Sequence, residues 1–524
     1  MAVRQFFLGS SLAHHVGAVR NAPREMIFNR TLLFSCILYA MSAVPLASAS
    51  SIPSLPGFQE QFDFDSGNSA LANRNFVSIV WVGAGVGGGA SFFLNSILGR
   101  RWSFRLYAAI WILGQVVATS SPTLSGLYVS RIISGLGIGA LTVIGPMSIA
   151  EIAPTEIRGT LTAWFNGAMN MGGTAGAFCV YGVFQNMTGT SLQYRIVWFT
   201  PAIFLFLCII ASFFISESPR WLLLVDRHEE ASQALVELRG LGLENPRVHL
   251  ELQEMKIAIQ EEQAMNAEGM SGILREALTI PSNLRRVQQS LVTYGLAQLS
   301  GANSVTSYFV PILTFIGIGG DSGRNIFLNC MYSFSKFCFA IIASLFFVDA
   351  LGRRKSLFVG ASLQMVSDLY LGVYIKYSQE GAEIAHSAST GAIEFIFIHG
   401  FGYVVGLYIL PYVFGGELWP NRIRSFGSAL GQCFHWLFMF AMAYGTPSLL
   451  AQTNNWGAFI FFAAWCFVAL VYVYLMVPET SGLSVEAMDK VFEGPWFNAA
   501  RRAHKSIPAH VGVEVDEEAK NAVR

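Results

Sequence analysis

A short phrase that occurs twice constrains the fold of this chain more than any other feature. Leu98-Gly99-Arg100-Arg101 lies in the first half of the sequence, and Leu351-Gly352-Arg353-Arg354 lies about half a chain later. A second pattern, a Glu followed seven residues later by an Arg, comes after each copy, at 151–158 and again at 417–424. Both patterns interrupt long apolar stretches. The repetition predicts two related halves built from the same kind of apolar elements.

The composition indicates which surroundings these halves fit. Hydrophobic residues make up 53% of the 524 residues and charged residues only 13%, whereas soluble domains carry about 25% charged residues. No Asp, Glu, Lys or Arg occurs in residues 159–194, 196–215 or 425–477, and a helix needs ~20 apolar residues to cross a bilayer. We therefore expect a lipid bilayer as the environment, and no nucleic-acid partner.

The apolar segments predict an all-α membrane protein with twelve transmembrane helices in two six-helix bundles. A charge-rich segment separates the sixth helix from the seventh, and residues 228–268 within it show the pattern of an amphipathic helix. The expected helices are 27–49, 75–95, 103–120, 123–147, 159–185, 193–215, 287–317, 324–348, 355–377, 391–415, 424–450 and 455–477.

Domain boundaries follow from these ranges. We expect an N-terminal segment, a first bundle, a helical linker, a second bundle and a C-terminal tail, with the linker and both ends in the cytoplasm. The corresponding ranges are 1–26, 27–215, 216–286, 287–477 and 478–524.

Orientation follows from the basic residues, which gather in the loops on one side of this layout and mark the cytoplasmic side. Asn186-Met187-Thr188 is then an external glycosylation sequon with Asn186 as the acceptor, whereas Asn29-Arg30-Thr31 is cytoplasmic and unused. The plasma membrane is the expected location. The basic residues are Arg20, Arg24, Arg30, Arg100, Arg101, Arg105, Arg158, Arg353, Arg354, Lys355, Arg422, Arg424, Arg501 and Arg502.

Several phrases in this order resemble the sugar-porter branch of the major facilitator superfamily, over about residues 30–495. The resemblance implies two six-helix bundles around a central solute cavity that opens alternately to either side. The N-terminal APREMIFNR and the phrase NSVTSYF also resemble the fungal quinate-permease-like subgroup. The matching phrases are RIISGLGIGA (131–140), PMSIAEIAPTEIRGTL (146–161), SESPRWL (216–222), QLSGANSVTSY (298–308), DALGRR (349–354), ELWPNRIR (417–424) and PETSGLSVEAMDKVF (478–492).

The same resemblance implies a charged gating network on the cytoplasmic face, which holds the bundles together while the outer side is open. The alternative is that these charges only anchor the topology. Ser96 stands where the family has an Asp, so the sequence predicts a weaker gate in the first half. The implied network comprises Arg100, Arg101, Arg131, Glu151, Arg158, Glu217, Arg220, Asp349, Arg353, Arg354, Glu417 and Arg424.

Amide and aromatic side chains are suited to a polyhydroxylated solute, because amides both donate and accept hydrogen bonds. Matching the family's spacing implies five candidates for the cavity: Asn166, Gln298, Asn303, Tyr412 and Trp436. The alternative for each is hydrogen bonding or packing between helices. For His435, packing is the favoured interpretation.

Lys336 is the strongest indication of the solute's chemistry. It lies in the middle of the eighth expected helix, with no acidic residue within ten positions. A charge at this depth is costly unless it meets a partner or a wet cavity. An ammonium in the cavity would complement a hydroxylated carboxylate such as quinate. The alternative, left open by the sequence, is that Lys336 pairs with Asp368 or extends to the membrane surface.

Energy coupling is also open at this level. The resemblance associates proton coupling with an Asp in the first helix, but no acidic residue lies between Met26 and Gln59. We expect transport of a sugar or a quinate-like acid, either proton-coupled or as a facilitative hexose uniporter; a non-transporting nutrient sensor is a weaker alternative. The sequence contains no P-loop, no metal-ligand cluster and no catalytic set, so we expect no enzyme activity, cofactor or metal. A monomer is expected to suffice.

Overall fold

The structure of this chain is a computed structural model. Three residues of the expected network and cavity, Asp349, Tyr412 and Glu417, lie outside the described part of the chain, as does the side chain of Arg424. Within the described part the secondary structure is helical, without strands. The structure describes residues 23–47, 52–62, 69–154, 157–265, 269–316, 322–343, 347, 351–381, 385–408, 411, 418–419, 423–479 and 491–492.

Six membrane-crossing stretches form the first half. The first is shorter than expected, because Pro45 in the following 3-10 turn, Val44–Ala47, lacks the N–H needed to continue a helix. The second and third stretches form one element, α6, with a break at Gly99 between them. The helices are α3 (Arg24–Ile27), α4 (Arg30–Met41), α5 (Pro56–Gln61), α6 (Ser69–Ser120), α7 (Leu124–Ile152), α8 (Arg158–Asn186) and α9 (Ser191–Ala211).

The second half contributes another six stretches. The first of these was expected as one helix over 287–317, but it is divided into α14, α15 and α16, with Gly301 at a positive φ of 80° at the first division. The fourth ends in a π-helical turn, Val404–Tyr408. The helices are α14 (Pro281–Leu299), α15 (Ala302–Ser307), α16 (Phe309–Ile316), α17 (Ser322–Ile342), α18 (Arg353–Gln379), α19 (His386–Tyr403), α21 (Arg424–Gln452) and α22 (Trp456–Met476).

Seven helices among the described residues are long and apolar enough, taken singly, to cross a membrane. This number is lower than twelve because α6 holds two crossings, α4 is short, the seventh crossing is divided, and α8 and α21 are not among the seven. The seven are Leu71–Ser120, Leu124–Ile152, Ser191–Phe214, Ser322–Ile342, Arg353–Gln379, His386–Tyr408 and Trp456–Met476.

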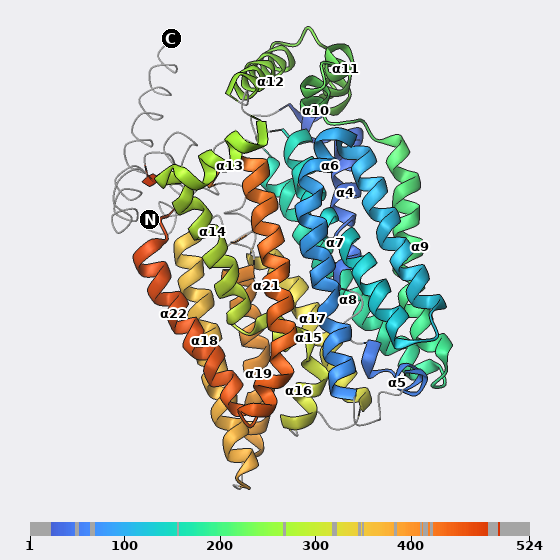
Figure 1. The fold of residues 1–524 in the computed structure, drawn as a ribbon, viewed down its shortest axis with the longest axis vertical. Coiled ribbons are helices and arrows are strands. Elements are labelled where there is room, and N and C mark those ends of the chain that lie inside the picture. Colours follow the sequence, from blue (N-terminus) through green and yellow to red (C-terminus); the bar gives the residue numbers. More distant parts are fainter. Residues whose placement is uncertain are drawn as a thin grey trace.

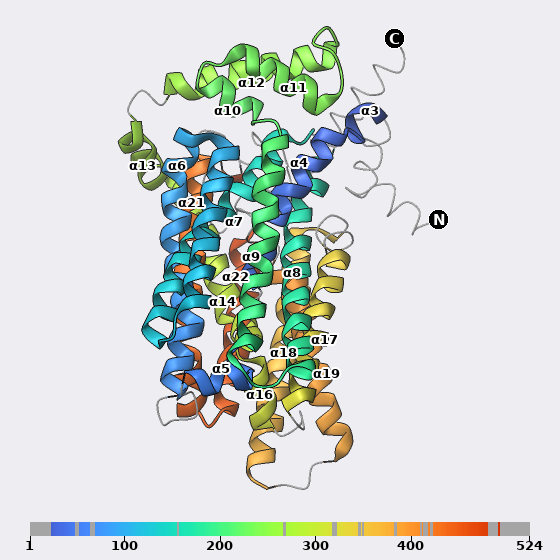
Figure 2. The same ribbon diagram turned by 90° about the vertical axis from the view of Figure 1, so that its right-hand side faces the viewer.

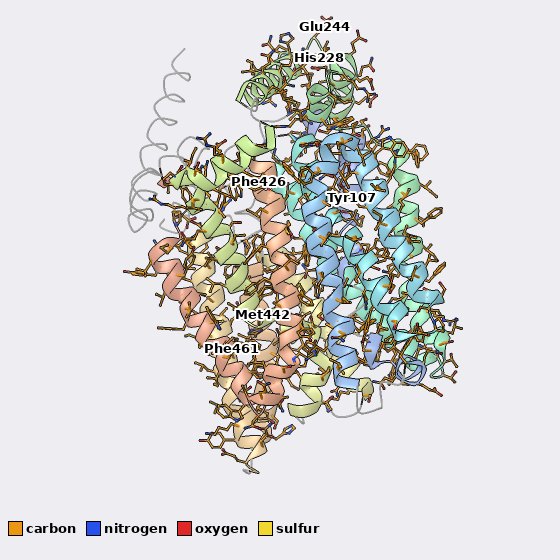
Figure 3. The ribbon with its side chains drawn as sticks, in the orientation of Figure 1. Tyr107, His228, Glu244, Phe426, Met442 and Phe461 are labelled. Atoms are coloured by element: carbon orange, nitrogen blue, oxygen red, sulfur yellow. The ribbon has the colours of Figure 1, made fainter. Side chains whose placement is uncertain are left out.

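The two halves stand side by side, and the linker lies across one end of them (Figures 1 and 2). We call this end the linker side and the opposite end the far side. His228 and Glu244 mark the linker in Figure 3, well away from Met442 and Phe461 in the second half. The linker helices are α10 (Pro219–Leu224), α11 (His228–Arg239), α12 (Pro246–Met265) and α13 (Gly269–Thr279).

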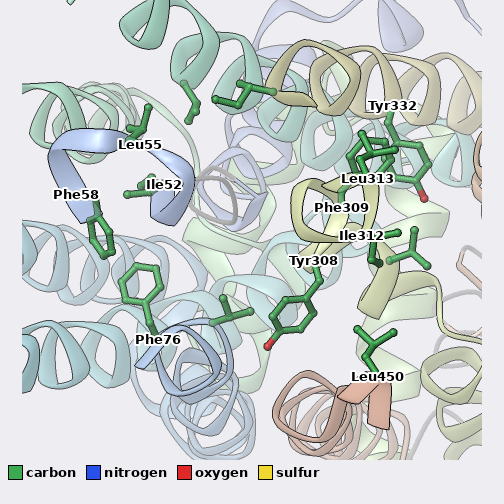
Figure 4. Close-up of a cluster of buried hydrophobic side chains, with 14 of the residues drawn as sticks. Ile52, Leu55, Phe58, Phe76, Tyr308, Phe309, Ile312, Leu313, Tyr332 and Leu450 are labelled. Carbon is green, nitrogen blue, oxygen red and sulfur yellow. The ribbon is translucent and has the colours of Figure 1, made fainter. Parts of the chain in front are cut away.

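On the far side, one apolar cluster joins both halves (Figure 4). Phe58 and Phe76 contribute from the first half, with ring centroids 5.3 Å apart. Tyr308 and Phe309 contribute from the second half, where the divided seventh crossing carries them. The two halves are therefore packed against each other at the end remote from the linker.

Hydrogen bonds from Arg239 connect the linker to the first half. Its side chain is 1% exposed and donates two hydrogen bonds to the Glu251 carboxylate, at 2.9 Å and 2.6 Å. Its remaining terminal nitrogen donates to the carbonyl of Ile152, the last residue of α7, at 2.7 Å. A buried guanidinium whose donors are satisfied in this way connects two linker helices to a transmembrane helix end.

We expect Arg239→Ala to destabilise the protein by about 1–3 kcal/mol, because a carboxylate and a helix-end carbonyl lose their donor. The measurement is the midpoint of thermal unfolding in detergent. Arg227→Ala is the matched control: the Arg227–Glu230 pair is about half exposed on both sides, and such pairs contribute little. An equal decrease in the unfolding midpoint for both variants would contradict a stabilising role for the Arg239 contacts.

Candidate functional site

Both copies of the Leu-Gly-Arg-Arg phrase adopt the same backbone turn. Gly99 has a φ of 79° and Gly352 a φ of 94°, a region that glycine enters without steric cost. In the first copy the two arginine N–H groups donate to Glu217, at 2.9 Å and 3.2 Å. In the second copy they donate to Glu479, at 2.9 Å and 3.2 Å. Each carboxylate thus caps a helix start, where negative charge is stabilised.

Glycine is required at both turns because a side chain would collide with the capping carboxylate. A Cβ atom at Gly99 would lie 2.9 Å from an oxygen of Glu217, and one at Gly352 would lie 2.8 Å from an oxygen of Glu479. Glu479 was missed among the expected network residues. Its signal is visible in the sequence, since Pro-Glu-Thr follows the last helix as Ser-Glu-Ser follows the sixth.

Arg100 and Glu151 form a two-point ion pair in the first half. The guanidinium donates to the two carboxylate oxygens at 2.7 Å and 2.6 Å, with side chains 8% and 12% exposed. Ser218 donates a further hydrogen bond to Glu151 at 2.6 Å. The pair connects α6, α7 and the start of the linker. Despite the absence of an Asp at Ser96, the first-half arginine has an acidic partner.

The second arginines of the two repeated phrases, Arg101 and Arg354, make equivalent contacts in the two halves. Arg101 donates to the carbonyl of Ile215 at 2.9 Å, and Arg354 donates to the carbonyl of Tyr474 at 2.7 Å. Of the remaining residues, Arg158 is the first residue of α8 and Arg353 is the first residue of α18. Arg220 lies in α10 and is close enough to Glu151 to interact with it electrostatically.

Arg131 lies apart from this network. It is near the far-side end of α7, whereas Glu151 is at the linker-side end, ~30 Å away along the helix. The Arg131 guanidinium stacks on the Phe76 ring, 3.9 Å from its centroid, and its Nε has no hydrogen-bond partner. The side chain is 8% exposed and lines the central cavity. The resemblance grouped it with the gate, but the structure places it in the wall of the central cavity.

The central cavity lies between the halves and has a volume of about 180 Å³. Direct contacts join its two walls. The Trp81 and Trp436 rings stack across the interface, 5.1 Å apart and within 5° of parallel. Asn170 of the first half donates to the Tyr408 hydroxyl of the second at 3.1 Å. Aromatic faces and amides of this kind suit a small hydroxylated ring.

Three of the six expected solute residues line the cavity, namely Asn303, Lys336 and Trp436. Gln298 lies behind the lining and hydrogen bonds to Asn303 at 2.8 Å and to His435 at 3.1 Å. His435, for which packing was favoured, itself lines the cavity.

Asn166 is absent from the lining among the described residues, and its place is taken by Asn170, one helical turn further along α8. The sequence signal for Asn170 is its spacing of four from Asn166, which puts both on one helix face. Tyr403 and Tyr408 were also missed. They line the cavity because the π-helical turn brings residues five apart to the same face.

Lys336 is held inside the cavity wall by neutral groups. Its side chain is buried, with the residue 9% exposed, and its ammonium donates to the Thr306 hydroxyl at 3.2 Å. The ammonium also lies 5.7 Å from the ring centroids of Tyr332 and Tyr403 and 6.0 Å from that of Tyr408. Such rings attract a cation through their faces.

The alternative of a Lys336–Asp368 ion pair does not match the described contacts. Asp368 faces His399 at 3.4 Å and accepts a long contact from Cys466 at 4.0 Å. Lys336 is therefore a cation in the cavity wall without an acidic partner among the described residues.

Known proteins share this architecture. A family model described as "Sugar (and other) transporter" matches residues 43–492. The quinate permease of Neurospora terricola is 29% identical over 479 residues, covering 88% of this chain and 87% of that protein. A probable quinate permease of Aspergillus niger is 28% identical, covering 94% of this chain and 93% of that protein.

Among solved structures, the proton:xylose symporter XylE bound to 6-bromo-6-deoxy-D-glucose matches with a TM-score of 0.74 at 20% identity, covering 89% of this chain and 100% of XylE. That identity supports the fold, and the family match extends over most of the chain. The relatives are transporters and not enzymes. This chain belongs to the sugar (and other) transporter family, whose model covers most of its length.

Proposed function

We propose that this protein transports a small hydroxylated carboxylate, such as quinate, by alternating access. The observation that carries the proposal is the Lys336 ammonium, which lies in the cavity wall with a hydroxyl and three tyrosine rings but no described acid around it. A membrane-buried charge is costly without a partner. A solute carboxylate would supply that partner.

The charge balance of the whole cavity supports an anion. Arg131 and Lys336 line it from opposite halves, and no Asp or Glu is among its described lining residues. Two cations facing one space repel each other, and an anion between them relieves the repulsion. The names of the relatives agree with this, since several are quinate permeases.

A neutral hexose is the second candidate, and one observation favours it. The stacked Trp81 and Trp436 rings, together with the amide of Asn303, offer a face and hydrogen bonds that need no charge on the solute. This alternative corresponds to a facilitative uniporter. Uptake measurements separate the two candidates.

For the gating step, we infer that the Arg100–Glu151 pair and the capped turns at Glu217 and Glu479 stabilise closure of the linker side. The pair and the first cap connect α6, α7 and the linker, and the second cap ties the start of α18 to the segment after α22. Loss of these contacts favours the conformation open on that side. A monomer contains the complete set, and the linker side is proposed to be cytoplasmic, in the plasma membrane.

Replacing Lys336 tests the solute assignment. We expect Lys336→Met to lower uptake of labelled quinate about 10- to 100-fold, the effect of losing a hydrogen bond to a charged group. The assay compares labelled quinate and labelled glucose in cells that lack their own hexose transporters. Lys376→Met, on the surface of α18, is the control and should leave uptake unchanged. Wild-type uptake of glucose alone, unaffected by Lys336→Met, would establish the neutral-hexose alternative.

The gate is tested by Glu151→Gln in a chain that keeps Cys433 as its sole cysteine. Cys433 is half-buried on α21 against Gly89 of α6. We expect an impermeant maleimide applied from the linker side to label Cys433 about 5- to 30-fold faster, as a loss of one or two kcal/mol implies. Glu230→Gln removes an exposed pair and serves as the control. Unchanged labelling in Glu151→Gln would mean that the pair only anchors the topology.

The orientation predicts which sequon carries a glycan. Asn186 is exposed at the far-side end of α8, whereas Asn29 caps α4 by accepting from the Leu32 N–H at 3.0 Å. We expect a glycosidase-sensitive mobility shift that Asn186→Gln abolishes. Thr31→Ala removes the other sequon while keeping the Asn29 cap, and the shift should persist. A mobility shift that Thr31→Ala abolishes would indicate the opposite orientation in the membrane.

A further inference from the structure

Asp368 and His399 form a buried pair that the transport steps described so far do not use. Asp368 lies in α18 and His399 in α19, with their side chains 0% and 1% exposed and a carboxylate oxygen 3.4 Å from the imidazole Nε2. Two titratable groups removed from water in a membrane protein are costly to keep. In general, well-packed apolar side chains stabilise a fold as well as a buried ion pair does, or better.

The hydrogen bonding of the pair is incomplete. His399 Nδ1 and Asp368 Oδ1 are buried without a hydrogen-bond partner. Gln364, on α18, donates to the Ser300 hydroxyl at 3.0 Å, and His399 Nε2 lies 3.3 Å from the Ser300 carbonyl. The pair thus has both a nitrogen and an oxygen at which an added proton can reside.

The contact with Ser300 connects the pair to the solute cavity. Ser300 ends α14 at the division of the seventh crossing, and α15 begins immediately after Gly301. From α15, Asn303 lines the cavity and Thr306 accepts the hydrogen bond from Lys336. A change of charge at His399 is therefore felt at the division of the seventh crossing, next to two groups that line the cavity or contact Lys336.

The Lys336 ammonium lies near the pair but makes no described contact with it. The residue after His399, Gly400, packs so closely on the Tyr332 ring that a Cβ there would lie 2.8 Å from it, and the same ring neighbours the Lys336 ammonium. Lys336 is near enough to act electrostatically on His399. Among the described residues, the other titratable groups that interact with the pair are Tyr332 of α17 and Cys466 of α22.

We propose that the Asp368–His399 pair binds the proton that accompanies the solute, one proton for each carboxylate. The inference rests on the proposed function, since it needs an anionic solute at Lys336. The proposal places energy coupling in the second half of the molecule. The first transmembrane helix, which contains no acidic residue, is then not needed for it.

The coupling is a charge balance over three groups. With an empty cavity, the Lys336 ammonium favours one negative charge on the pair through space, without contacting it. A solute carboxylate bound to Lys336 takes over that balance, and the pair then accepts a proton and becomes neutral. By reciprocity, a protonated pair leaves Lys336 free to bind the carboxylate more tightly.

This stoichiometry also removes an energetic obstacle. Moving one negative charge against an inside-negative potential costs about 2.3 kcal/mol per 100 mV. A monoanion carried together with one proton moves no net charge, so the potential no longer opposes uptake. The proton gradient alone then sets the accumulation.

The test uses the full-length protein in liposomes with the membrane potential clamped at zero. An imposed gradient of one pH unit should concentrate labelled quinate about ten-fold in the wild type, because one proton per solute makes the two concentration ratios equal. Asp368→Asn and His399→Gln should accumulate none, while still exchanging labelled for unlabelled quinate at equal pH. Ser367→Ala, a buried neutral neighbour on α18, is the control and should do both.

The outcomes distinguish this inference from the proposed function. A wild type that fails to exchange quinate refutes the proposed function. A wild type that exchanges quinate but does not follow the pH gradient overturns only the proton site, as does ten-fold accumulation retained by both variants. Loss of exchange in both variants, with Ser367→Ala intact, also overturns it, because the pair would then be required for the transport cycle itself.

Discussion

The capped turn at each Leu-Gly-Arg-Arg phrase is the contact on which the rest of this structure depends. A carboxylate from the segment after the sixth or the last crossing accepts the first amides of a helix that begins at a positive-φ glycine. Helix starts leave backbone N–H groups without partners, and a bilayer supplies no water to replace them. The same solution in both halves ties each bundle's last helix to its third, so the halves behave as matched units across a central space.

The central cavity differs electrostatically from the linker side, because its cations have no acidic partners among the described residues. On the linker side, Arg100 has a bidentate acidic partner, whereas Arg131 and Lys336 in the cavity have aromatic rings and a hydroxyl instead. Satisfied ions stabilise one conformation, while unsatisfied ions create affinity for a ligand of the opposite charge. In the proposed function, gating and solute recognition therefore use the same residue types and differ in whether the protein itself supplies the counter-charge.

Sequence patterns predicted much of this site and missed parts for definable reasons. The repeated phrases predicted the two halves. The family's spacing indicated Asn303 and Trp436, and the mid-helix position of the charge indicated Lys336; all three line the cavity. The π-helical turn that presents Tyr408 has no simple periodic signature, so it was missed. Arg131 was grouped with the gate on the family resemblance, whereas its depth along α7 becomes visible only in the structure.

The sequence by itself determined the fold class, the family and the duplication, because these depend on apolar segment length and on local phrases such as a glycine followed by two arginines. Only the tertiary structure decided which charges have partners. Asp368 faces His399 rather than Lys336, and Glu479 caps a helix more than one hundred residues before it in the chain. Such pairings depend on how helices far apart in sequence are brought together, because electrostatic and hydrogen-bond energies fall off within a few ångströms.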